Sequence, residues 1–429
     1  MIKSNAIIFL AILSLLSVSP LFIAANAQSE EAWTMFHNDL AHTGYSSNTN
    51  PSTNQTLWVF PTGGKIWSSP IIFNGIVYFG SLDHHVYAVN AKNGSKIWDF
   101  IAGNRVYPTP AYYNNAIYVG SDDNNFYALD AQSGTLLWKF PTGNQIQSSA
   151  IISNDIVYFG SSDRNLYALN ATNGALIWNF TTGNSVISSP CLANGVIYVG
   201  SYDRNIYALD AQTGAEKWRF PTGSAIESSP VFADGNIYVG SHDNNTYAVT
   251  ADRGSLVWKV PTGYADCIQA SPAFANGIIY TGDSYNGNVL ALDPKNGGTK
   301  WNYTTGSYTQ VFNNSEFSGS YTISGVYTAA VVGNVEYANA LDNKTYALNA
   351  ETGSLIWSYQ TNGNIYSSPT VANGVVYFGS DDHNMYAVGQ ISNTGAGTSF
   401  PVIIYYAAIA IVVILVVAVA ILMILRRRK

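Results

Sequence analysis

The chain has 429 residues, and only 10% of them are charged. Outside its two apolar ends it carries 14 basic and 26 acidic residues, a net charge of −12, which argues against nucleic-acid binding because such a surface repels phosphates. The 37 glycines and 30 tyrosines indicate many turns and aromatic strands, so the composition favours an all-β protein.

Residues 1–27 have the layout of a secretory signal peptide. Lys3 precedes an apolar run over residues 6–16, and the small-residue pattern Ala25-Asn26-Ala27 follows. We expect cleavage after Ala27. An uncleaved N-terminal membrane anchor is the alternative, against which the short run and its interruption by serine and Pro20 both argue. A lead-in segment, residues 28–56, comes next.

Residues 57–390 repeat one unit about forty residues long. Each unit has two alternating strands around a turn that is mostly Asn-Gly, as in residues 68–81, then a third strand, a glycine turn and a fourth strand around a tryptophan. Four strands per unit without a helical period predict a β-propeller blade. We expect the recurring tryptophans to pack between neighbouring sheets. They are Trp58, Trp98, Trp138, Trp178, Trp218, Trp258, Trp301 and Trp357.

The number of third strands predicts the number of blades. Their motif occurs eight times, at Tyr87, Tyr127, Tyr167, Tyr207, Tyr247, Leu290, Tyr346 and Tyr386. No fourth strand follows Tyr386, whereas an unpaired "LWVF" stands at residues 57–60. The sequence therefore predicts an eight-bladed propeller of four-stranded antiparallel blades, in which this N-terminal strand closes the ring, since an open edge would invite aggregation.

An aspartate recurs in the second hairpin of the units, in the pattern "GS-x-D". It is found at Asp83, Asp123, Asp163, Asp203, Asp243 and Asp382. We expect each to form an Asx turn, in which the carboxylate accepts a hydrogen bond from the backbone two residues on. A ring of calcium ligands is the alternative.

The C-terminal end predicts a membrane anchor. After a linker at residues 391–401, residues 402–425 form an uninterrupted apolar stretch of 24 residues, long enough to cross a bilayer as one helix. The basic residues 426–429 that follow should stay in the cytoplasm, which leaves the propeller on the extracytoplasmic side. Removal of the tail by a sorting enzyme is the alternative, but the preceding "SNTGAGTSFP" holds no clear recognition motif.

Three segments resemble those of propellers of the pyrroloquinoline quinone (PQQ) type. "ALDAQTGAEKW" at residues 208–218 resembles their tryptophan-docking repeat. Residues 228–249 are similar to the PQQ-like repeats of outer-membrane assembly lipoproteins, and "WTMFHNDLAHTGYS" at residues 33–46 is similar to the segment that precedes such propellers. The resemblance covers residues 33–390. It implies the propeller fold, and either a partner-binding scaffold or a quinone-dependent dehydrogenase.

The residues needed for quinone chemistry are not found. Quinone-dependent alcohol dehydrogenases of this family carry adjacent cysteines over the cofactor and acidic and amide calcium ligands. Here Cys191 and Cys267 are 76 positions apart, and Glu227 is the only acid at its position in the repeat. Ser-His-Asp and HExxH arrangements are also missing. We therefore expect no PQQ and no catalysis, with a quinone- or metal-dependent oxidoreductase as the alternative.

The repeat breaks on one face of the predicted ring. Two residues are added in "YADCIQASP" before Pro272, and sixteen more fall between Trp301 and Tyr346, in residues 306–325. Both insertions connect an outer strand to the next inner strand. The longer one contains Phe312, Phe317 and Tyr321 among small polar residues, a mixture typical of recognition surfaces. A neutral surface insertion is the alternative.

Aromatic residues gather on the same face. The inner-strand position two before the Ser-Pro pair, or its equivalent, is aromatic in four consecutive blades and otherwise polar or aliphatic. The four are Trp67, Tyr107, Tyr327 and Tyr366, and His84 and His383 share a hairpin position in adjoining blades. We predict that these residues bind a protein or glycan partner. Packing between blades is the alternative for the aromatics.

No metal site is predicted. His37, Asp39 and His42 of the lead-in could ligate a metal, but ordinary hydrogen bonding and packing suit them better, and Cys191 is expected in the core. The sequence thus predicts a membrane-anchored extracytoplasmic propeller that acts as a non-catalytic binding or scaffold module of the cell envelope.

Overall fold

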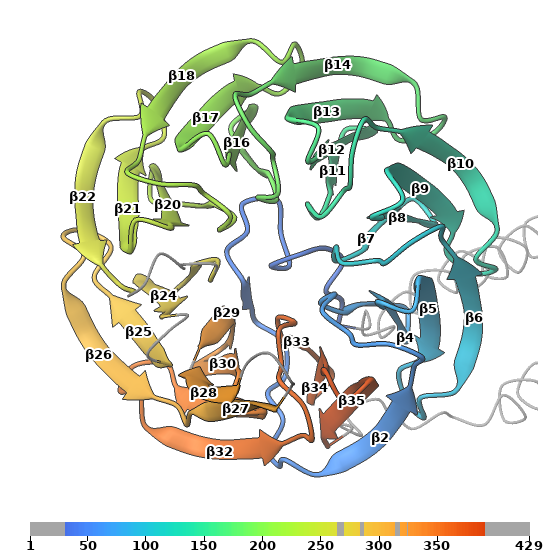
Figure 1. The fold of residues 1–429 in the computed structure, drawn as a ribbon, viewed down its shortest axis with the longest axis vertical. Coiled ribbons are helices and arrows are strands. Elements are labelled where there is room, and N and C mark those ends of the chain that lie inside the picture. The colour runs from blue at the N-terminus through green and yellow to red at the C-terminus, as the bar shows by residue number, and fades with distance from the viewer. Residues whose placement is uncertain (1–30, 264–269, 284–286, 314–317, 324, 391–429) are drawn as a thin grey trace, which may run out of the picture. The chain divides into compact units, whose positions relative to one another are not determined.

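The computed structural model describes residues 31–263, 270–283, 287–313, 318–323 and 325–390, which belong to one compact unit, Glu30–Ile391. Eight sheets stand around a common axis in this unit, and each contains four antiparallel strands that step outward from the axis (Figure 1). One of the sheets has a fifth, short strand in addition. The predicted eight-bladed all-β propeller is confirmed.

The inner strand of every blade lies nearest the axis. These are β3 (Ile71–Phe73), β7 (Ala111–Tyr113), β11 (Ile151–Ser153), β15 (Cys191–Ala193), β19 (Val231–Ala233), β23 (Ala273–Ala275), β29 (Val326–Val332) and β33 (Thr370–Ala372). The second strands are β4 (Ile76–Gly80), β8 (Ala116–Gly120), β12 (Ile156–Gly160), β16 (Val196–Gly200), β20 (Asn236–Ser241), β24 (Ile278–Gly282), β30 (Val335–Ala340) and β34 (Val375–Gly379).

The third and fourth strands complete the blades. The third strands are β5 (His85–Asn90), β9 (Asn125–Asp130), β13 (Asn165–Asn170), β17 (Asn205–Asp210), β21 (Asn245–Thr250), β25 (Asn288–Leu292), β31 (Lys344–Asn349) and β35 (Asn384–Gly389). The outer strands are β6 (Lys96–Ile101), β10 (Leu136–Pro141), β14 (Leu176–Thr181), β18 (Glu216–Pro221), β22 (Leu256–Pro261), β26 (Thr299–Thr304), β32 (Leu355–Gln360) and β2 (Thr56–Pro61).

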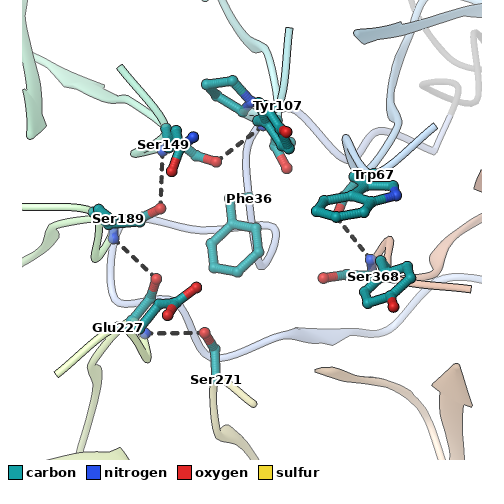
Figure 2. Close-up of a pocket in the computed structure, with 15 residues that line it drawn as sticks. Phe36, Trp67, Tyr107, Ser149, Ser189, Glu227, Ser271 and Ser368 are labelled. Carbon is teal, nitrogen blue, oxygen red and sulfur yellow. Dashed lines mark hydrogen bonds between the residues drawn. The ribbon is translucent and has the colours of Figure 1, made fainter. Parts of the chain in front are cut away.

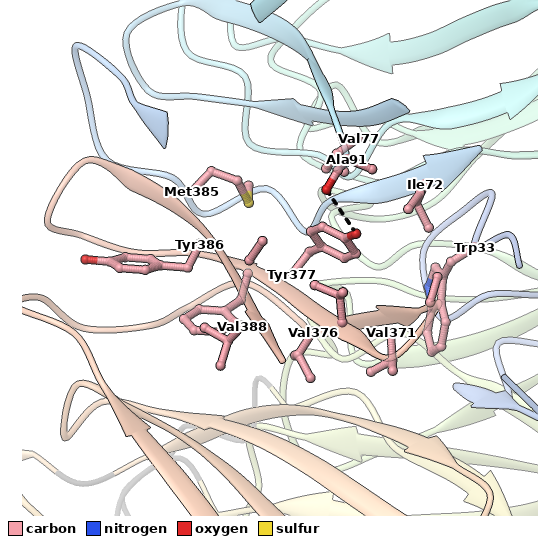
Figure 3. Close-up of a cluster of buried hydrophobic side chains, with 14 of the residues drawn as sticks. Trp33, Ile72, Val77, Ala91, Val371, Val376, Tyr377, Met385, Tyr386 and Val388 are labelled. Atoms are coloured by element: carbon pink, nitrogen blue, oxygen red, sulfur yellow. Dashed lines mark hydrogen bonds between the residues drawn. The ribbon is translucent and has the colours of Figure 1, made fainter. Parts of the chain in front are cut away.

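The N-terminal strand β2 is the outer strand of the sheet that begins with β33. It pairs antiparallel with β35, and Trp58 lies opposite Ala387. The hydrophobic cluster around this sheet joins it to the first blade, because Tyr377 of β34 packs with Val77 and donates a hydrogen bond to the Ala91 carbonyl at 3.5 Å (Figure 3). Trp33 of the lead-in belongs to the same cluster.

The recurring tryptophans pack between blades, as predicted. Trp98 of the first blade donates its indole N–H to the Ala131 carbonyl of the second blade at 2.9 Å. The turn glycine beside it, Gly134, has φ +70°, and a β carbon there would come within 2.6 Å of the Trp98 ring. The glycine of the repeat is therefore required both by the turn and by the ring that lies on it.

The repeated aspartates form the predicted Asx turns and also fix the neighbouring connection. One carboxylate oxygen of Asp83 accepts the backbone N–H of His85 at 3.1 Å. The other accepts the Tyr87 hydroxyl at 2.8 Å and the N–H of Gly63 at 2.7 Å. Gly63 lies in the connection that enters the blade, so the aspartate holds that connection against the hairpin.

The lead-in segment runs along the inner strands, inside the ring (Figure 1). Its carbonyls accept backbone N–H groups from blade after blade, for example Thr34 from Tyr112 at 2.8 Å and Ala41 from Phe232 at 2.9 Å. Its short strand β1 (Tyr45–Ser46) pairs parallel with β29, so this one blade has five strands. The lead-in therefore belongs to the core of the propeller unit.

The long insertion contains two paired strands, which we call the hairpin β27–β28. Strands β27 (Tyr308–Asn313) and β28 (Ser318–Ile323) pair antiparallel as a separate two-stranded sheet between β26 and β29, which is the predicted connection. Within the described part of the chain, no helix has the length and apolar character needed to cross a membrane. The apolar stretch at residues 402–425 lies outside the described residues.

Candidate functional site

The connections between blades meet at one end of the axis, around a cavity of about 500 Å³. The repeat position two before the Ser-Pro pair supplies six of the residues that line it, and Phe36 of the lead-in lies among them (Figure 2). The six are Trp67, Tyr107, Gln147, Ile187, Glu227 and Tyr366. The expectation that they belong to the inner strands is wrong. Strand β3, for example, begins only at Ile71, because Ser68 and Ser69 bond to neighbouring blades instead of continuing the ladder.

Two rings of serine hydroxyls hold the wall of the cavity. In the outer ring, Ser68 accepts the N–H of Gly80 in its own blade and donates to the Pro108 carbonyl of the next blade at 2.8 Å. In the inner ring, the Ser149 hydroxyl accepts the N–H of Thr109 from the preceding blade at 3.0 Å. The repeated "SSP" could have predicted these hydrogen bonds between blades, but we did not predict them from the sequence.

Three aromatic side chains form one wall. Trp67 stacks on Tyr366 with ring centroids 4.5 Å apart and meets Tyr107 edge-on at 5.3 Å. The Trp67 indole N–H donates to Asp381 at 2.7 Å, and Lys65 forms an ion pair with the same carboxylate at 2.7 Å. The structure thus brings together three of the four predicted aromatics. They pack on one another across blades and also face the cavity.

The opposite wall carries a carboxylate. Glu227 accepts the Tyr202 hydroxyl at 2.5 Å and lies 3.4 Å from the imidazole Nε2 of His242. Two blades earlier in the ring, Gln147 donates to Asp122 at 3.1 Å. Burial raises the pKa of the Asp122 carboxyl above its ordinary value, and the hydrogen bond from Gln147 offsets part of this shift.

These pairs follow one rule that the sequence analysis did not find. The "x" residue of "GS-x-D" in one blade contacts the cavity residue of the next blade. The pairs are Asp381 with Trp67, Asp122 with Gln147, and Tyr202 with Glu227. The signal was present, since "x" varies between blades while its neighbours repeat.

Phe36 lines the cavity from the lead-in and separates it from two buried histidines. The Phe36 ring stacks on His37 at 4.2 Å and meets His42 edge-on at 5.4 Å. Burial lowers the pKa of His37 to about 4 and that of His42 to about 3, so both imidazoles are neutral. Asp39 accepts the backbone N–H and the hydroxyl of Thr43. Among the described residues, no group of three or more histidine, cysteine, aspartate or glutamate side chains could hold a metal ion.

Two other predicted site residues, both histidines, do not line this cavity. His84 and His383 are exposed in their hairpins, at φ 76° and 69°. Tyr327 lies in β29, Phe312 in β27 and Tyr321 in β28. Phe317 and Cys267 lie outside the described residues. Cys191 is fully buried in β15, as expected, and burial raises the pKa of its thiol.

Comparison with known proteins gives one family and many similar folds. The family described as outer membrane protein assembly factor BamB matches residues 26–188, 181–322 and 321–395. No curated protein sequence matches the chain.

Among solved structures, BamB from Moraxella catarrhalis is 18% identical with a TM-score of 0.64, covering 79% of this chain and 100% of that one. Quinohemoprotein alcohol dehydrogenase from Comamonas testosteroni is 16% identical with a TM-score of 0.69, covering 86% of this chain and 82% of that one. The computationally designed Ika8 protein is 16% identical with a TM-score of 0.64, covering 78% and 100%. At these identities the likeness concerns the fold alone.

Proposed function

The chain belongs to the family of the outer membrane protein assembly factor BamB, a family of PQQ-like propellers, and from this premise we propose that it is a non-catalytic binding module of the cell envelope. Its partner, a protein segment or a glycan, enters the cavity at the end of the propeller axis. The family description, with its role in assembly, supports a protein partner before a glycan.

The observation that carries this proposal is the pre-formed aromatic wall of the cavity. Trp67 is fixed by its hydrogen bond to Asp381 and by stacking on Tyr366, so little side-chain freedom remains to be lost on binding. Apolar rings with a few placed polar groups, in a cavity of about 500 Å³, suit a short peptide segment or a sugar.

The lining of the cavity argues against the alternative of a quinone-dependent oxidoreductase. PQQ is a tricarboxylate, and its binding requires cations or a bound metal ion. Among the described residues that line the cavity, Glu227 alone carries a formal charge, and that charge is negative. Cys191, fully buried in β15, is not one of the described lining residues. These residues do not fit the quinone.

The proposal includes the position of the module in the cell. We infer that residues 1–27 direct export, that residues 402–425 anchor the chain in the membrane, and that the propeller stands on the extracytoplasmic side. We also infer that β2 closes the ring. The last repeat supplies three strands, β33–β35, and β2 pairs with β35 as the fourth, so the outer edge of this sheet is covered as in the other blades.

The test compares full-length protein, purified in non-ionic detergent, with a Trp67→Ala/Tyr366→Ala variant. Partner capture from the native envelope and a glycan array should both be scored as differences between the two proteins. We expect the double variant to lose the ligand that the wild type retains. A Lys92→Ala/Gln132→Ala variant, altered in turns on the opposite face, should bind normally.

Two results would contradict the proposal. Loss of binding in the Lys92→Ala/Gln132→Ala variant, with the cavity variant unaffected, would place the site on the other face. A quinone spectrum retained by the protein after addition of PQQ and calcium, together with dye-linked alcohol oxidation, would establish the oxidoreductase instead.

A further inference from the structure

We propose that the cavity selects a protein segment with a basic side chain, whose ammonium or guanidinium group binds Glu227. This inference rests on the proposed binding function and adds the chemical class of the partner. A neutral glycan is the competing ligand.

Glu227 is a charged acceptor that faces the cavity. Its side chain is 26% exposed, and it lies on the wall across from Trp67 (Figure 2). It is the one formally charged side chain among the described residues that line the cavity, and it accepts the Tyr202 hydroxyl at 2.5 Å. The imidazole Nε2 of His242 lies 3.4 Å from the same carboxylate. A basic side chain would therefore supply the opposite charge.

The neighbours of Glu227 suit the aliphatic part of such a side chain. Phe36 and Ile187 line the cavity with it and present apolar surface. Lysine and arginine bury their methylene groups on surfaces of this kind and leave the charged end with a polar partner. Residues that flank the basic one would then meet the aromatic rings of Trp67 and Tyr107, which also attract cations.

The cations near the aromatic wall already have acceptors. Lys65 is paired with Asp381 at 2.7 Å, and Arg105 donates to the Tyr107 hydroxyl at 3.2 Å. An anionic ligand would have to compete with these contacts and would face Glu227 across the cavity. Anionic segments are therefore disfavoured.

The charge of the whole propeller acts in the same direction. The 14 basic and 26 acidic residues outside the two apolar ends give a net charge of −12. A surface with this excess of negative charge attracts basic partners and increases their rate of association at low salt. A neutral glycan would gain nothing from this field, and this difference favours the basic protein segment.

The experiment measures the binding of fluorescein-labelled, end-capped pentapeptides Gly-Leu-Xaa-Leu-Gly by full-length protein in non-ionic detergent, using fluorescence anisotropy. Xaa is arginine, lysine, norleucine or glutamate. We expect the arginine and lysine peptides to bind at least about 10-fold more tightly than the norleucine peptide, and the glutamate peptide to bind worst. Raising NaCl from about 50 to about 500 mM should weaken only the basic peptides.

Two variants test the role of Glu227. Glu227→Gln keeps the size of the side chain and an acceptor for Tyr202, and it should bind arginine and norleucine peptides about equally. Glu216→Gln makes the same change of charge in an exposed ion pair with Arg219 on β18, and it should behave as the wild type. Equal thermal melting of the three proteins shows that the fold is intact, and the salt series on wild-type protein tests the proposal without any variant.

The outcomes separate this inference from the proposed function. Equal binding of the arginine and norleucine peptides by wild-type protein, or binding of neutral array glycans only, would overturn the basic-segment inference and keep the cavity as a binding site. If no peptide and no glycan binds, and Trp67→Ala/Tyr366→Ala captures the same partners as the wild type, both proposals are wrong.

Discussion

The first five blades and the blade of β29–β32 are built from the same repeat but differ in their interior. In the first five, the second strand carries an aliphatic side chain, such as Val77 or Ile117, at a fully buried position. In the β29–β32 blade this position is Glu336, which is equally buried, and neither of its carboxyl oxygens has a hydrogen-bond partner among the residues that the structure describes. Burial raises its pKa to about 8.

The same blade differs in three further ways. Asn339 replaces the glycine that Gly80 represents in the first blade, and it donates to the Ser367 carbonyl of the next blade at 2.7 Å. Strand β1 adds a fifth strand, and the hairpin β27–β28 precedes it. Repetition thus marks the scaffold, whereas several departures from it meet in the β29–β32 blade.

The largest effect is expected where the scaffold is completed by the N-terminal strand. Deleting residues 28–62 removes β2 and the lead-in, and should lower the free energy of unfolding by about 5 kcal/mol or more. Burial of Trp58 and Phe60 alone contributes about 1.5–3 kcal/mol each, before the lost backbone hydrogen bonds are counted. Urea unfolding of the full-length and deleted proteins measures the difference.

A matched pair of substitutions refines this test. Trp58→Ala in β2 and Trp98→Ala in β6 should each cost about 3–5 kcal/mol, because both rings are 7% exposed and lie on a glycine turn of the next blade. A much smaller cost for Trp58→Ala would show that β2 is not equivalent to the other outer strands.

The next effect concerns Glu336 and depends on pH. Its folded pKa of about 8 lies above the ordinary 4.5, so the folded protein keeps a proton that the unfolded chain has lost between these values. Stability should therefore fall as pH rises from about 4.5 to 8, by at most about 1.4 kcal/mol per pH unit. In Glu336→Ile, which restores the aliphatic side chain of the other blades, this decline should be largely removed.

Chemical denaturation at pH 5, 6.5 and 8 would measure the slope. Glu351→Gln, at an exposed turn of the same blade, is the control and should keep it. If Glu336→Ile proves less stable than the wild type at pH 8, the carboxylate has a partner that stabilises it, and the interior of this blade is not a weak point.

An effect of comparable size and opposite sign should come from the lead-in. The folded pKa values of His37 and His42, about 4 and about 3, lie below the ordinary 6.5, so the folded state favours neutral imidazoles. Their contribution to stability is present above pH 6.5 and is lost as pH falls towards 3–4. His42→Phe should reduce this loss of stability at low pH, while His84→Ala, at an exposed hairpin, should leave it unchanged. Melting temperatures from pH 4 to 7 would show whether it does.

The parts of the structure that recur could be predicted, and those that occur once could not. Trp98, Gly134 and Asp83 repeat at fixed spacing, so their packing and turns follow from local geometry and from the need to cover each sheet. The cavity residues were found for the same reason, since Trp67 and Glu227 share one position of the repeat. Phe36 was not found, because the path of the lead-in depends on contacts with many blades at once. Glu336 could have been noticed as an acid at an aliphatic position.

The smallest effect on stability, and a large effect on binding, is expected for the hairpin β27–β28. Among the described residues its two strands pair only with each other, as a separate sheet, and the first five blades are joined without such an insertion. Shortening residues 306–325 to the length of those connections should therefore change the free energy of unfolding by less than about 1 kcal/mol. The hairpin stands in one of the connections between blades, and the connections between blades carry the residues that line the cavity. We therefore expect the shortened protein to melt like the wild type and to lose partner capture. Unchanged capture by a shortened, folded protein would restrict recognition to the cavity and make the hairpin a neutral insertion. A large drop in the melting temperature would instead assign the hairpin to the scaffold and remove the contrast between repeated and unrepeated parts.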